Sequence, residues 1–80
     1  MFIHIGGDIF IKIKDVIAIL DMNHLGHNIN KEEYFQTLEK SHQVVKITMK
    51  NIKSIIFTTD IVYYSPISSL TLKRRADLSN

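Results

Sequence analysis

The residues that come nearest to a metal site are two histidines three positions apart, His24 and His27. On a helix this spacing would present two imidazoles to one ion. The asparagines and the glycine around them favour a loop instead, and Asp21 is the one nearby candidate for a third ligand. We therefore expect no metal site and no bound cofactor.

The serines and carboxylates that could act in catalysis stand where helix capping accounts for them. Ser65, Ser68 and Ser69 cluster near an expected helix start, and no Gly-x-Ser-x-Gly sequence accompanies them. Glu32 and Glu33 stand at the start of another expected helix, where the helix dipole favours negative charge. The residues therefore predict neither an enzyme nor a small-molecule substrate.

Positive charge gathers in the second half of the chain. Residues 41–80 hold 6 basic and 2 acidic residues, whereas residues 1–40 hold 4 and 6, and the formal net charge is +2. This asymmetry is compatible with a face that meets a polyanion and equally with ordinary solvated surface. The basic residues concerned are Lys46, Lys50, Lys53, Lys73, Arg74 and Arg75.

Isoleucine dominates the apolar residues, and this favours strands. The chain has 14 isoleucines but only 2 alanines, and branching at Cβ suits a pleated surface better than a helix. Apolar alternation and short apolar runs predict strands over 2–5, 9–14, 16–20, 44–49, 54–58 and 60–65. We expect strand 16–20 to be covered on both faces. We also expect a turn at Lys50-Asn51 to join 44–49 to its partner 54–58.

Two helices complete the expected α+β domain, in which the strands form one small antiparallel sheet. Asn30 followed by Glu33 matches a capping box, which predicts a helix from there to about Ser41. Ser65-Pro66 resembles an N-cap followed by proline at the first helical position, which predicts a second helix over about 66–76.

The composition also excludes several classes of protein. A chain without cysteine is neither a disulfide-stapled secreted fold nor a zinc knuckle. The longest apolar run, Val16–Leu20, is far shorter than the roughly 20 residues of a membrane helix, and no signal-peptide pattern precedes it. With these classes excluded, we expect a cytoplasmic protein. A domain of 80 residues buries a modest share of its surface, so we also expect it to gain stability by forming a homo-oligomer.

Several segments resemble a known family of regulators. The most specific are DIVYYSP at 60–66 and SSLTLKRRA at 68–76, and further ones lie at 2–6, 14–21 and 53–56, with Phe35 in the first helix. Together they cover essentially the whole chain. They resemble the RemA/RemB family of small bacterial regulators, formerly a domain of unknown function, so residues 1–80 are expected to form a single RemA-like domain.

The resemblance implies an assembly and a function. It implies a LytTR-related fold without a helix-turn-helix, and closed rings that wrap double-stranded DNA to activate biofilm matrix genes. In the RemA branch an adjacent arginine pair, in the turn after the central strand, is associated with DNA binding. The matching positions here hold Lys50 and Asn51, with Lys53 where a further arginine would be. Lysine lacks the planar fork of arginine, yet it binds phosphate as a point charge.

Two hypotheses of different kinds follow. The first is a ring-forming transcriptional regulator that contacts the DNA backbone through basic turns, without a membrane partner. Its candidate DNA-binding residues are Lys50, Asn51 and Lys53, with Lys73, Arg74 and Arg75 as a second group. The alternative is a structural or interaction subunit of a ring, which modulates a related regulator and does not itself bind DNA.

Overall fold

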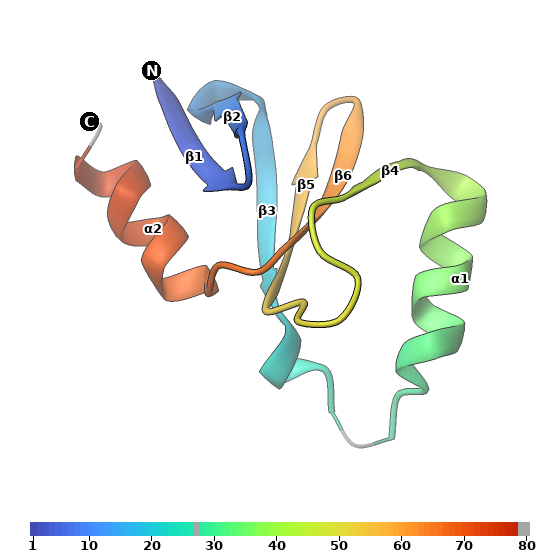
Figure 1. The fold of residues 1–80 in the computed structure, drawn as a ribbon. Helices are drawn as coiled ribbons and strands as arrows, with labels where there is room; N and C mark the ends of the chain where they lie inside the picture. Colours follow the sequence, from blue (N-terminus) through green and yellow to red (C-terminus); the bar gives the residue numbers. More distant parts are fainter. Residues whose placement is uncertain (27, 79–80) are drawn as a thin grey trace.

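The computed structural model describes residues 1–26 and 28–78, and within them it has six strands and two α-helices (Figure 1). The α+β class with two helices is thereby confirmed. The elements follow in the order β1 (Phe2–Gly6), β2 (Ile9–Lys12), β3 (Val16–Asp21), α1 (Lys31–Ser41), β4 (Gln43–Lys46), β5 (Ser54–Thr58), β6 (Ile61–Ser65) and α2 (Ser69–Leu78). Short 3₁₀ turns, Ile13–Asp15 and Met22–His24, lie directly before and directly after β3.

The strands divide between two sheets, and one pairing is parallel. β1 and β2 form an antiparallel hairpin, while the larger sheet has the order β3-β5-β6-β4. The prediction of one antiparallel sheet was wrong, because the described strands form two sheets and one of them contains a parallel pair. The prediction that 44–49 pairs with 54–58 was also wrong. β4 lies parallel to β6, from Gln43 opposite Ile61 to Lys46 opposite Tyr64, and β6 separates it from β5.

β3 is an edge strand with an exposed side, so the expectation that both of its faces are covered was wrong. The register shifts between Val16 and Ala18, which leaves Ile17 as an extra residue in the ladder. Its side chain is 68% exposed. A bulge of this kind bends an edge strand and obstructs pairing with another strand.

The first helix begins where the sequence predicts. The Asn30 side chain accepts a hydrogen bond from the Glu33 amide at 3.1 Å, and α1 runs from Lys31 to Ser41. The cap satisfies one of the amides that a helix start leaves without a partner. Leu38 is the buried residue of this helix.

The second helix begins three residues later than predicted. Ser65 belongs to β6, where it pairs with Ser54, and its hydroxyl donates to the Ile5 carbonyl at 2.6 Å. Ser68 takes the capping role instead, because its Oγ accepts from the Thr71 amide at 3.2 Å. The serine before the proline thus ends a strand and joins it to β1.

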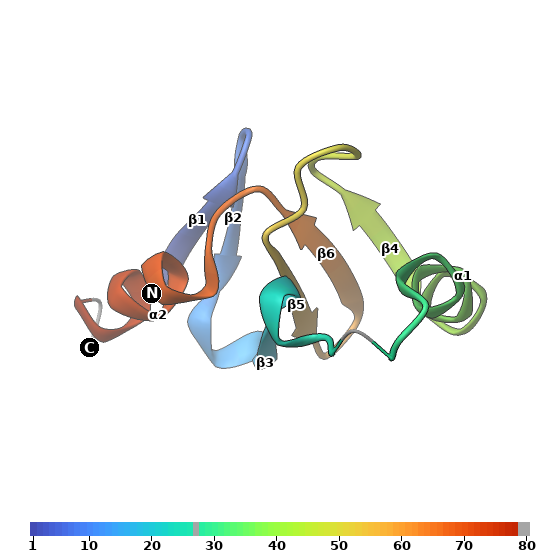
Figure 2. The same ribbon diagram turned by 90° about the horizontal axis from the view of Figure 1, so that it is seen from below.

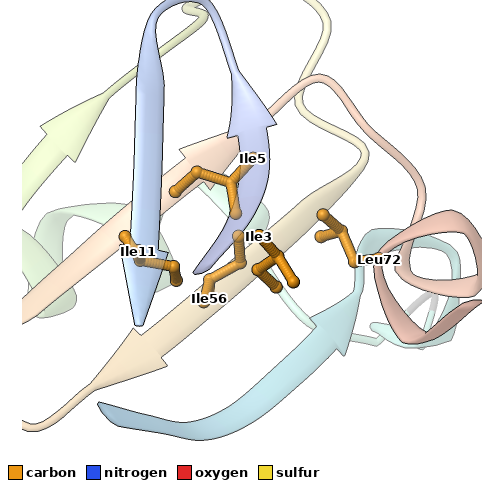
Figure 3. Close-up of a cluster of buried hydrophobic side chains, with 5 residues drawn as sticks. All are labelled: Ile3, Ile5, Ile11, Ile56 and Leu72. Atoms are coloured by element: carbon orange, nitrogen blue, oxygen red, sulfur yellow. The ribbon is translucent and has the colours of Figure 1, made fainter. Parts of the chain in front are cut away.

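Two apolar clusters cover opposite faces of the larger sheet. Neighbouring residues of a strand point to opposite faces, so Ile56 enters one cluster and Ile55 the other. The first cluster joins the sheet to the hairpin and α2, and its buried members are Ile3, Ile5, Ile11, Ile56 and Leu72 (Figure 3). The second joins the sheet to α1, and its buried members are Met22, Leu38, Ile55, Val62 and Tyr64.

A polar contact holds α1 against β4 and β6. Glu39 pairs with the Lys46 ammonium at 2.7 Å and accepts a hydrogen bond from the Tyr64 hydroxyl at 3.2 Å. The hydrogen bond from Lys46 lowers the pKa of Glu39 below its usual value. Burial and the Glu39 charge raise the pKa of Tyr64 well above its usual value. The Lys46 ammonium is therefore engaged in a contact between β4 and α1.

None of the helices within the described residues combines the length and the apolar character needed to cross a membrane.

Replacing the cap residue tests the account of α1. Asn30→Ala removes the acceptor for the Glu33 amide, and we expect it to lower the free energy of unfolding by about 0.5–2 kcal/mol. Urea denaturation at one fixed protein concentration measures this loss. Asn30→Asp is the matched control, since a carboxylate also caps a helix, and it should leave the stability nearly unchanged. Equal losses in both variants would contradict the capping role.

The Glu39 contact predicts a dependence of stability on pH. The folded state lowers the pKa of Glu39, so its stabilising effect is complete above the unfolded-state pKa and is lost as the pH falls through the folded-state pKa. We expect Glu39→Gln to be less stable than the wild type near neutral pH. The difference should shrink as the pH drops through the acidic range. Urea denaturation of both proteins across that range would contradict this if the difference stayed constant.

Candidate nucleic-acid interface

Residues 47–53, which we call the 47–53 loop, cross the carboxyl end of β6 on their way from β4 to β5. The crossing is required because β6 lies between those two strands. Both ends of the loop bind adjacent carbonyls of β6: the Ile47 amide donates to Tyr64 at 3.1 Å, and the Lys53 amide donates to Ser65 at 2.8 Å. The Lys53 carbonyl in turn accepts from the Met22 amide at 3.1 Å. The loop is therefore held at its base.

The turn between β1 and β2 packs beside Ile47 of this loop, and both the turn and the loop point to the same side of the molecule (Figure 2). Gly6 has a φ of +123°, and a Cβ built there would lie 3.0 Å from Pro66 Cδ and 3.1 Å from Ile47 Cγ2. A larger residue would thus be strained and would also push the loop away. Gly7 also has a positive φ, and its position lies beside Ile47.

The loop presents its lysines and its asparagine to solvent and its isoleucines to the protein. Lys50, Asn51 and Lys53, the first group of candidate DNA-binding residues, are exposed. Ile47 and Ile52 pack against the two apolar clusters. Within the described residues the two lysine ammonium groups make no hydrogen bond or ion pair. Two ammonium groups and an amide on an anchored loop can contact phosphates by charge and hydrogen bonding.

The second basic group lies apart from the loop. It belongs to α2, which flanks β1 at the opposite end of the molecule from α1 (Figure 1). Lys73 and Arg74 are exposed, but Arg75 is half-buried and donates from Nη1 to the His4 carbonyl at 2.8 Å. Arg75 was predicted as a DNA-binding candidate, and the structure uses its guanidinium to hold α2 on β1.

Asp21 is a polar residue whose role sequence reasoning missed. Its carboxylate accepts from the Asn23 amide at 2.8 Å and from the Ser69 hydroxyl at 3.2 Å, which links the end of β3 to the start of α2. The hydrogen bond from Asn23 lowers the pKa of Asp21, and the charge of Lys73 acts in the same direction. The pattern Asp-x-Asn was a signal for the first contact. Nothing local in the sequence indicates the second.

The metal-binding candidates can be placed only in part. His24 ends the 3₁₀ turn Met22–His24 and is exposed, and His27 lies outside the described residues. Across residues 1–26 and 28–78, no three histidine, aspartate or glutamate side chains are grouped as ligands for one ion.

Comparison with known proteins places the chain in a family. A model of the RemA-like family, described as extracellular matrix regulatory protein A-like, matches residues 2–76. The chain is also 38% identical over 78 residues to extracellular matrix regulatory protein B of Bacillus subtilis (strain 168). That match covers 95% of this chain and 90% of the relative. Because one family model matches nearly all of the described fold, the chain belongs to the RemA-like family.

Proposed function

We propose that this protein is a DNA-binding regulator of extracellular matrix genes that acts as a ring-forming homo-oligomer and has no enzymatic activity. The family and the name of the Bacillus relative support a role in matrix regulation. The observation that carries the proposal of DNA binding is the 47–53 loop. It is anchored at both ends and offers Lys50, Asn51 and Lys53 to solvent.

One loop is too small to bind DNA tightly. Each phosphate that a lysine neutralises contributes only about −0.9 to the slope of log affinity against log salt concentration, and one loop offers two lysines. A ring repeats the same loop around its circumference, so several weak contacts act on one duplex. Contacts to the backbone position the protein, and any sequence preference would come from how easily the DNA deforms.

Exposed apolar side chains support the assembly. The β1–β2 hairpin buries Ile3, Ile5 and Ile11, and its opposite face carries Phe2 and Phe10, which are 58% and 61% exposed. Ile17 on the edge strand β3 is 68% exposed. In a cyclic assembly with heterologous contacts, every subunit would cover such surfaces in the same way.

The alternative is a ring subunit that modulates a related regulator without binding DNA. The observation that favours it is the composition of the loop, where an asparagine stands beside Lys50 and no arginine is present. With Lys46 paired to Glu39 and Arg75 bound to His4, the cations available to DNA are few.

The role of the loop can be tested by removing both of its charges. We expect Lys50→Ala combined with Lys53→Ala to weaken DNA binding for all sequences alike. The slope of log affinity against log salt should become less negative by about 2 for each subunit that contacts the duplex. Gel-shift titrations at two salt concentrations measure both effects. The paired substitution Lys73→Ala with Arg74→Ala is the matched control, because it removes two exposed charges from α2.

Three results of these titrations separate the hypotheses. A loop variant that remains folded and keeps the wild-type affinity and slope would show that the loop is not the interface. A larger loss in the α2 variant would move the interface to that helix. If the wild-type protein binds no DNA at low salt, the alternative of a non-binding subunit replaces the proposal.

The assembly can be tested through the bulged residue of β3. We expect the wild type to have a mass well above the 9.3 kDa of one chain, and Ile17→Glu to shift the mass toward that value. Light scattering at micromolar concentration measures the mass. Gln36→Glu adds the same charge at an exposed position of α1 and serves as the control. A wild-type mass of 9.3 kDa would refute the assembly.

A further inference from the structure

Met49 stands out in the 47–53 loop because it is apolar and faces solvent. Its side chain is 76% exposed, the highest value among the exposed large hydrophobic residues of the described chain. The other two large apolar residues of this loop, Ile47 and Ile52, both pack against apolar clusters. The loop thus buries the apolar residues near its ends and leaves the one between them in water.

The surroundings of Met49 match the chemistry of a nucleic-acid contact. Lys50 and Asn51 follow it directly, and Lys53 lies at the end of the same loop, all of them exposed. The ammonium groups attract phosphates, and asparagine can hydrogen-bond to the acceptors on the floor of the minor groove. An unbranched methionine side chain is flexible enough to enter a gap of irregular shape.

Backbone hydrogen bonds and packing hold the base of the loop on either side of Met49. Ile47 and Lys53 bind adjacent β6 carbonyls through their amides, and the Gly6-Gly7 turn packs beside Ile47. An apolar wedge must separate two stacked base pairs, which costs free energy. A held backbone reduces the further entropy cost of ordering the loop.

We propose that Met49 is a wedge residue, which inserts between base pairs from the minor groove and kinks the DNA while Lys50 and Lys53 hold the adjacent phosphates. This inference rests on the proposed DNA binding and adds to it the way in which the duplex is deformed. Apolar side chains inserted at a base step kink a duplex by about 20–90°. Flexible pyrimidine–purine steps are the expected sites, since they unstack most easily.

The test uses a short A·T-rich duplex that carries 2-aminopurine at a TA step, because the fluorescence of this base rises when it unstacks. We expect the wild type to raise the fluorescence on binding. Met49→Gln keeps a similar side-chain length but is polar, so it should lose most of the rise. It should retain the salt slope, because the lysines are unchanged. Met49→Leu is the matched control and should keep the rise, since leucine also acts as a wedge.

The possible failures of this experiment are distinguishable. If the wild type binds the duplex without a rise in fluorescence, or if Met49→Gln gives the full rise, the wedge is refuted while DNA binding stands. If Met49→Gln changes the mass in light scattering, Met49 belongs to a contact between subunits and the wedge is also refuted. If the wild type does not bind the duplex, the proposed function fails first and the wedge fails with it.

Discussion

The parallel pairing of β4 with β6 is the constraint on which the candidate interface depends. Because β5 pairs with the other edge of β6, the chain cannot pass from β4 to β5 by a tight turn and must cross the end of β6. The carbonyls of Tyr64 and Ser65 lie at this end, and they bind the amides at the two ends of the crossing segment. Sheet topology therefore both creates the 47–53 loop and holds it.

The same end of β6 also gathers segments that are distant in the sequence. Ser65 donates to the carbonyl of Ile5, and Pro66 packs against Gly6, so the β1–β2 turn is held beside the loop. These contacts would hold a candidate interface in place before any ligand arrives, which would lower the entropy cost of binding. A change at Gly6 would disturb the loop without touching Lys50, Asn51 or Lys53.

Local signals were predictable from the sequence, whereas long-range pairing was not. The Asn30 cap and the first helix follow from a pattern within four residues, and the structure confirms both. The second helix was placed too early because Ser65 and Ser68 both suit a cap, and only the Ile5 carbonyl, sixty positions away, distinguishes them. Apolar alternation in 44–49 indicates a strand but carries no information about its partner. Resemblance to a family located the loop residues, and the pairing explains their exposure.

The basic residues divide into those that stabilise the fold and those that are available to a partner. Lys46 neutralises Glu39, and Arg75 binds a backbone carbonyl of β1. Net charge counts these residues equally with Lys50 and Lys53, so the total of +2 says little about any one surface. What matters for a polyanion is where unpaired cations are held together. Within the described residues the 47–53 loop meets that condition, since its lysines are exposed, lack an ionic partner and share a fixed base.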